Sequence, residues 1–285
     1  MASRRPTVTE LLRLHHDELT PAERRVAAAI ADDPEAVAFG TVAELARRSA
    51  TGGATVVRLA AKLDLDGFSA LQDRIRDELR TRLRPAAQRI REPLPDDPLD
   101  RALSTEVDNL AQTFAGIDRD RFRRAVAVLS DLDHGIAVLS GTESTGVAGQ
   151  LAAELHALRP GVVHLTGSDV AVVQLAATLE PGTVLVAVDF HRYDRAVLDA
   201  LSVVAHVSGP VIAVTDSELS PLARRTELAF VVAATGAGPF DSKVAALALL
   251  QALAVGTAVA LVDSATDRLD RAEAAWGRLG MLSDE

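Results

Sequence analysis

Five short apolar runs in the last two thirds of the chain constrain its fold most strongly. They span residues 135–140, 162–165, 183–188, 211–215 and 228–232, and helical stretches separate most of them. Such continuous apolar runs are typical of strands that are buried on both faces. Because strands that alternate with helices form parallel sheets, we predict an α/β domain with a five-stranded parallel sheet and helices on both faces.

The residues after the predicted strands form a candidate ligand site, because ligands of open α/β sheets bind outside the carboxyl ends of the strands. The candidates follow the first and third strands: Gly141, Glu143, Ser144, Thr145, His191 and Arg192. Glycine allows close backbone approach, and the free N–H groups of a helix start attract anions. We therefore expect a small anionic, hydroxylated effector at this edge. Simple helix capping by Ser144 is the alternative.

Helix-start signals dominate the first third of the chain. Residues 20–23 (TPAE) and 41–44 (TVAE) each place Thr three residues before Glu, which is the pattern of a capping box. The second box opens a helix that we expect to reach about residue 48. After a short break, a further helix is predicted from about residue 52 to 63. Two helices joined by a short turn predict a helix-turn-helix, whose second helix enters the major groove of DNA.

That second helix carries two stripes of side chains. Val56, Leu59 and Leu63 share an apolar face that we expect to pack against Val42 and Leu45. The other stripe offers hydroxyls and cations, which suit base edges and phosphates. The DNA-binding candidates are Thr51, Gly53, Thr55, Arg58 and Lys62. From spacing alone, a helical bundle with a solvated polar stripe is an equally good interpretation.

Charge is distributed unevenly along the chain, whose formal net charge is −10. Residues 1–92 contain 16 Lys and Arg against 14 Asp and Glu, whereas the remainder contains 14 against 26. This balance argues against a general nucleic-acid coat but allows a local basic surface in the first third. A proline-rich stretch marks a boundary. We therefore expect a helix-turn-helix domain at 1–84, a linker at 85–100 and the α/β domain at 101–285.

Both parts of the chain resemble one family. Residues 20–24 (TPAER), 42–46 (VAELA), 54–58 (ATVVR) and Gly67-Phe68 resemble the RpiR-type (MurR/RpiR) bacterial transcription regulators. Thr215-Asp216 and the run 220–223 (SPLA) resemble their sugar isomerase (SIS) domain. The resemblance spans about residues 7–265. It implies a regulator that binds operator DNA, a SIS domain that binds an effector, usually a phosphosugar, and a homodimer or homotetramer.

The chain departs from the family pattern at three places. Gly52 stands where the family commonly opens the recognition helix with Ser, and Ala50 replaces the glycine of the turn. After the third strand, the family's Ser-x-Ser-Gly-x-Thr is replaced by residues 189–194 (DFHRYD). Arg192 there could grip phosphate or carboxylate, whereas Asp189 would repel an anion unless it faces away. Another anionic metabolite, or a site that has lost its ligand, is therefore an alternative to a phosphosugar.

Catalytic signals are weak. The chain has no Cys, and it has no Walker A, Gly-x-Gly-x-x-Gly or His-Glu-x-x-His motif. We therefore expect no catalytic residue, no cofactor and no metal site. One alternative is a sugar-phosphate isomerase with an accessory helical domain, for which His191 and Glu143 are the acid–base candidates. Another is a helical module that binds protein instead of DNA.

Residues 244–262 have the length of a membrane span. Alanine dominates this segment and no Lys/Arg cluster flanks one end, so we expect a buried or subunit-interface helix and no membrane association. The absence of Cys and of an apolar segment near Met1 leads us to expect a cytoplasmic protein.

Overall fold

The computed structural model describes residues 8–15, 18–83, 86–91, 97–204, 209–218 and 220–281. The chain divides into two compact units, Met1–Arg91 and Glu92–Glu285. Much of the predicted linker, including Pro85, Pro93 and Pro95, lies outside the described residues. Its described part contains a short helix, α7 (Ala86–Arg89), and the start of α8 (Pro98–Ala115).

The first unit is helical, as predicted. Besides α7 it contains α1 (Val8–Leu14), α2 (Pro21–Asp32), α3 (Pro34–Phe39), α4 (Val42–Arg48), α5 (Gly53–Lys62) and α6 (Gly67–Leu83). Both predicted capping boxes form, at Thr20/Glu23 on α2 and at Thr41/Glu44 on α4. The core includes Val56, Leu59 and Leu63 together with Leu45, and Val42 packs against it. The apolar stripe of α5 is therefore confirmed.

The turn between α4 and α5 forms without a glycine at its tightest point. Ala50 takes up the left-handed conformation, with φ of 49°. Thr51 N–H donates to the Ala46 carbonyl oxygen at 2.8 Å, which closes the turn. Gly52 serves as the N-cap of α5 without a side-chain hydrogen bond. Both departures from the family pattern are thus compatible with the helix-turn-helix geometry.

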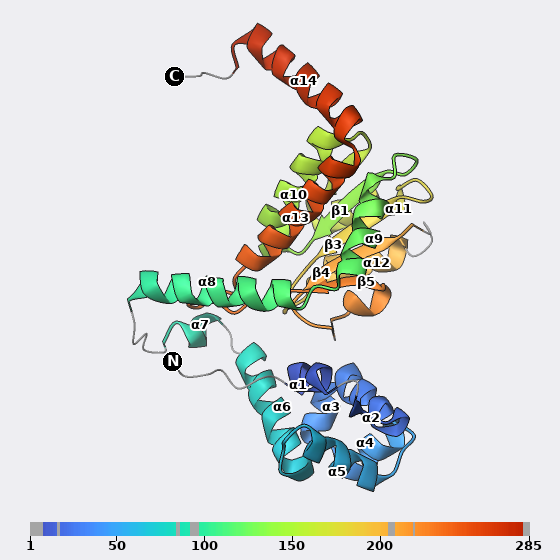
Figure 1. Cartoon of the computed structure of the whole chain (residues 1–285), viewed down its shortest axis with the longest axis vertical. Coiled ribbons are helices and arrows are strands. Elements are labelled where there is room, and N and C mark those ends of the chain that lie inside the picture. The colour runs from blue at the N-terminus through green and yellow to red at the C-terminus, as the bar shows by residue number, and fades with distance from the viewer. Residues whose placement is uncertain are drawn as a thin grey trace. The chain divides into compact units, whose positions relative to one another are not determined.

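The second unit contains the predicted five-stranded parallel sheet, with strand order β2-β1-β3-β4-β5. Figure 1 labels β1, β3, β4 and β5 of this sheet. The strands are β1 (Ile136–Ser140), β2 (Val162–Leu165), β3 (Val184–Val188), β4 (Val211–Thr215) and β5 (Leu228–Val231). In this order β1 lies between β2 and β3, and the connections reverse direction there. The crevice at such a switch point is where ligands of open α/β sheets bind.

Helices cover both faces of the sheet because successive strand residues point to opposite sides. Ile136 and Val138 of β1 pack with α9 (Arg119–Ser130), α10 (Thr145–Leu158) and α13 (Val244–Ala260). Ala137 and Leu139 pack with α11 (Asp169–Ala177) and α12 (Arg195–Val204) on the other face. The sheet is therefore buried on both sides, which explains the continuous apolar runs in the sequence.

The segment that has the length of a membrane span forms α13, which lies in this core. Ala245, Leu249 and Leu253 are fully buried, whereas Val255 and Val259 near its end are exposed. None of the described helices is by itself long and apolar enough to cross a membrane. α13 passes that test jointly with α14 (Val262–Leu279), from which it is separated by a 102° bend.

Candidate functional site

The outward surface of α5 is the candidate nucleic-acid interface of the first unit. Four of its side chains are exposed: Ala54, Val57, Arg58 and Ala61. They follow the spacing i, i+3, i+4 and i+7, so they form one continuous face of the helix. This surface differs from the predicted polar stripe, which shares Arg58 with it but is rotated around the helix.

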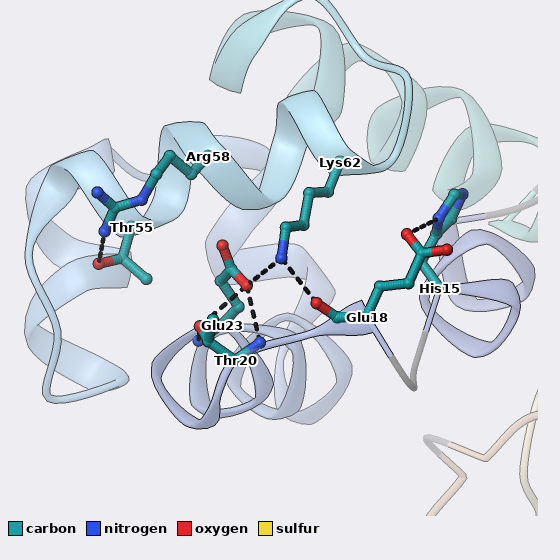
Figure 2. A network of polar contacts seen from close by, with 7 residues as sticks. All are labelled: His15, Glu18, Thr20, Glu23, Thr55, Arg58 and Lys62. Carbon is teal, nitrogen blue, oxygen red and sulfur yellow. Dashed lines mark hydrogen bonds and ion pairs between the residues drawn. The ribbon is translucent and has the colours of Figure 1, made fainter.

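Lys62 is directed into its own domain instead of away from it. Its ammonium donates to a Glu23 carboxylate oxygen at 2.8 Å and to the Glu18 carbonyl oxygen at 2.7 Å (Figure 2). Glu23 is almost completely buried, and its carboxylate also accepts hydrogen bonds from the N–H and hydroxyl of Thr20. The hydrogen bond from Lys62, and then those from Thr20, lower the pKa of Glu23 to about 2 against the opposing effect of burial. Lys62 therefore joins α5 to α2.

Three other candidates also have partners within the domain. Thr55 is buried, and its hydroxyl accepts a hydrogen bond from the Arg58 guanidinium at 3.2 Å (Figure 2). The Thr51 hydroxyl lies 2.8 Å from that of Ser49. A Cβ atom at Gly53 would come within 3.1 Å of Val42 Cγ1, so glycine lets α4 and α5 pack closely. Of the five predicted residues, Arg58 is the exposed one.

The candidate effector site lies at the carboxyl ends of β1 and β3, the neighbouring strands at the switch point. After β1, Gly141 precedes a short 3-10 turn (Thr142–Ser144) that leads into α10. Ser144 is buried, and its Oγ has no hydrogen-bond partner among the described residues. The Thr145 hydroxyl donates to the Gly141 carbonyl oxygen, and Glu143 is exposed. Ser144 thus does not cap α10, which goes against the simple capping alternative.

The loop after β3 is held together by its own carboxylates. Asp189 accepts hydrogen bonds from the N–H groups of Phe190 at 2.9 Å and Asp194 at 2.7 Å. Asp194 in turn accepts from the N–H and hydroxyl of Thr142, which connects the loops after β1 and β3. Asp216, after β4, accepts from the His191 N–H and the Tyr193 hydroxyl. The carboxylates of these three residues accept hydrogen bonds from backbone N–H groups that could otherwise donate to a bound anion.

Asp189 lies at the centre of this arrangement and does not face away. A Cβ atom at Gly141 would clash with its carboxylate, so the Asp189 side chain fills the space beside Gly141. Burial raises the pKa of Asp189 to about 6, and the nearby carboxylates of Asp194 and Asp216 add to the rise. The backbone N–H groups of Asp194 and Phe190 act in the opposite direction. The site therefore contains a carboxyl group that titrates close to neutral pH.

Two cationic side chains lie in or beside the loop after β3. Arg192 is exposed within the loop after β3. Lys243 precedes α13, and its ammonium lies 4.7 Å from the ring centroid of Phe190, the residue after Asp189. Lys243 was not among the predicted site residues, because those candidates follow the first and third strands. Lys243 lies in the loop that leads from β5 to α13, so including the residues after the fifth strand among the candidates could have identified it.

Comparisons with known proteins match both units. A model of the helix-turn-helix domain of the rpiR family matches residues 7–82. A model of the SIS domain matches residues 134–256. "Bifunctional protein glk" of Paraburkholderia xenovorans is 26% identical over 262 residues, which cover 88% of this chain and 40% of that protein. The same protein of Burkholderia thailandensis is 25% identical with the same coverage. The chain thus spans about two fifths of the length of these curated relatives.

Two solved structures are similar in fold. The NanR protein of Vibrio vulnificus, complexed with ManNAc-6P, superposes with a TM-score of 0.58 at 23% identity and covers 95% of this chain and 98% of that one. The sugar isomerase domain of an RpiR transcription factor from Sphaerobacter thermophilus gives a TM-score of 0.55 at 29% identity. It covers 61% of this chain and 97% of that domain.

Proposed function

Because the chain belongs to the RpiR type of transcription regulators, with a helix-turn-helix domain before a SIS domain, we propose that it binds operator DNA through α5 and responds to a phosphosugar or another small anionic metabolite. The effector site is the β1/β3 edge of the sheet. The protein acts in the cytoplasm as a regulator and not as an enzyme.

The observation that carries the DNA-binding proposal is the exposed face of α5 around Arg58. This face belongs to the second helix of the pair, the one that enters the major groove in helix-turn-helix proteins. Arg58 offers a guanidinium that can contact guanine, and the first N–H groups of α5, at Gly53, can contact a phosphate. Arg47 on α4 is exposed as well and adds positive charge to the unit, whereas the exposed Arg48 forms an ion pair with Asp33 at 3.0 Å.

The effector proposal rests on the residues at the β1/β3 edge. Arg192 and Lys243 supply positive charge, and Gly141, Ser144 and Thr145 supply a strand-to-helix turn that suits an anion. The buried Ser144 hydroxyl has no hydrogen-bond partner among the described residues, and a ligand that reaches it would supply one. His191 and Glu143 border the same edge. The complex of NanR with ManNAc-6P supports a phosphosugar as the first compound to test.

An oligomer is part of the proposal, and α8 provides its surface. The side of α8 that faces the rest of its unit is polar: Asn109 donates to the Thr235 carbonyl oxygen, and the Thr113 hydroxyl accepts from Ala233 N–H. Large apolar side chains, 45 to 77% exposed, line another side: Leu99, Leu103, Val107 and Phe114. Leu110, partly buried, continues this stripe. An exposed apolar stripe of this length indicates a protein interface.

The spacing of this stripe favours a second copy of the same chain. In an antiparallel pair of α8 helices, Leu99 lies opposite Phe114 and Leu103 lies opposite Leu110, because both pairs share one midpoint. A surface that matches itself in this way is what a twofold dimer requires. Dimers of helix-turn-helix proteins bind two half-sites on DNA, which agrees with the proposed function.

The test is a binding measurement with the full chain and duplexes from upstream of its own gene and neighbouring genes, over a salt series. We expect selective binding that weakens steeply as salt rises, relative to a scrambled duplex. Binding no better than to the scramble, for these duplexes and for those selected from a random pool, contradicts the proposal. In the same assay, Arg192→Ala should bind DNA normally but lose the response to hexose phosphates. Turnover of aldose or ketose phosphates by the purified chain would favour the isomerase alternative.

A further inference from the structure

We propose that α5 reads thymine methyl groups through an apolar surface made of Ala54, Val57 and Ala61, next to a guanine read by Arg58. This inference rests on the proposed function and specifies which bases the operator contains. Val57 carries the argument, because it is a branched apolar side chain that is 45% exposed on a helix whose other large apolar residues are buried.

The polar side chains of α5 are turned away from this surface. Thr55 is buried beneath Arg58, and Lys62 is held by Glu23 and Glu18 of the α2 region. On the fully described helix α5, the exposed face therefore consists of three aliphatic side chains and one guanidinium. It carries no amide or carboxylate.

The edges of the bases decide what such a surface can recognise. In the major groove, thymine presents a methyl group, whereas adenine and cytosine present an amino group that needs a polar partner. Asn and Gln recognise adenine and Asp and Glu recognise cytosine, but neither type stands on this face. An aliphatic surface gains from contact with a methyl group and leaves an amino group without a hydrogen bond. It therefore selects thymine by attraction and disfavours the other bases by desolvation.

Arg58 is oriented for its part by Thr55. One N–H of the Arg58 guanidinium donates to the Thr55 hydroxyl at 3.2 Å, and this leaves four of its five N–H donors for other acceptors. Guanine offers two acceptors, O6 and N7, to a guanidinium in the major groove. Because Val57 precedes Arg58 directly, we expect the recognised thymine to neighbour this guanine in each half-site.

The experiment uses the full chain and duplexes that it selects from a randomised pool. Each thymine of a selected half-site is replaced in turn by deoxyuridine, which removes only the methyl group. We expect one or two positions in each half-site at which the affinity falls roughly fourfold, the ratio expected for losing the burial of one methyl-sized group. The same positions should lose most of this sensitivity in Val57→Ala, because the two methyl groups of Val57 that contact the thymine methyl group are removed.

The matched control is Phe39→Ala, which removes an exposed apolar side chain of the same unit outside α5. This variant should keep the full sensitivity to deoxyuridine. If selected duplexes bind tightly and tolerate deoxyuridine at every position, the thymine proposal is overturned while the regulator stands. If Val57→Ala keeps the sensitivity, another residue makes the contact and the assignment to Val57 is wrong. If no duplex is selected at all, the proposed function fails as well.

Discussion

The ammonium of Lys62 lies 2.8 Å from the buried carboxylate of Glu23, 39 residues away in the sequence. Glu23 belongs to the capping box at the start of α2, and Lys62 is the last residue of α5. The pair therefore joins the helix proposed to read DNA to a helix of the domain core. A cation that spacing alone assigns to DNA is used here to hold the recognition helix in place.

The pair predicts a pH-dependent stability of the first unit. The pKa of Glu23 is about 2 in the folded chain, below its ordinary value of 4.5. Its contribution is therefore fully present above about pH 4.5 and is lost as the pH falls towards 2. Because Lys62 is partly exposed, we expect Glu23→Gln to lower the free energy of unfolding by about 2 kcal/mol at pH 7.

Urea unfolding between pH 2.5 and 7 measures this dependence. The matched control is Glu44→Gln, which alters the equivalent glutamate of the other capping box, at an exposed position on α4. This control should have a smaller effect. An equal loss for both variants, or a loss from Glu23→Gln that does not shrink in acid, would show that the contact with Lys62 is unimportant.

Arg58 and Lys62 should differ in their effects on DNA binding. Arg58→Ala is expected to weaken binding to the selected duplex by about 1–3 kcal/mol, because a base contact is lost. Lys62→Met should lower thermal stability but leave the affinity and its salt dependence unchanged at a temperature where the domain is folded. Fluorescence anisotropy over a salt series compares the two variants. A loss of salt dependence in Lys62→Met would instead place Lys62 at a phosphate.

The turn before α5 contains a residue that glycine should improve. Ala50 is held at a φ of 49°, where a Cβ atom is unfavourable. Relief of the strain at Ala50 should raise the free energy of unfolding by about 1 kcal/mol in Ala50→Gly. The greater conformational entropy of glycine in the unfolded chain opposes this gain, so we expect a net increase of less than that. Ala28→Gly, at an exposed position within α2, is the control and should lower it by about 1 kcal/mol. Destabilisation by both variants would argue that Ala50 is not strained.

Effector binding should depend on pH through Asp189. Its carboxyl group has a pKa of about 6, so it is ionised at pH 7.5 and mostly protonated at pH 5.5. Because an ionised Asp189 repels an anion, we expect the affinity for a hexose phosphate to rise as the pH falls. Calorimetry at both pH values is the measurement, with Asp189→Asn as the control. The titration of the phosphate itself is common to both proteins, so an equal pH dependence would exclude Asp189 as the cause.

The apolar stripe of α8 should control the oligomeric state. Leu103→Asp places a charge within the stripe, opposite Leu110 of the second copy, and we expect it to convert a dimer into a monomer at micromolar concentration. Ser104→Asp adds the same charge at the next, exposed position of the helix and should leave the dimer intact. Light scattering after size exclusion measures both masses. A wild-type chain that is already monomeric would contradict the proposed dimer through α8.

Local patterns in the sequence were sufficient to predict the strands and several of the helices. The five strands, the two capping boxes and the pair α4/α5 lie where the sequence analysis expected them, because each depends on residues that are close neighbours in the chain. The apolar face of α5 was also predictable, since Val56, Leu59 and Leu63 repeat at helical spacing. The resemblance to RpiR-type regulators was recognisable for the same reason, because it rests on short runs of residues.

Tertiary structure alone decided how the polar side chains are used. Spacing shows that Lys62 and Arg58 lie near each other on a helix. It does not show that Lys62 forms an ion pair with Glu23, which belongs to a distant segment of the sequence. Likewise, Asp194 accepts a hydrogen bond from the N–H of Thr142, 52 residues away in the sequence, because β1 and β3 lie side by side. The physical reason is that a buried polar group needs a partner, and packing between helices and strands determines which partner is within reach.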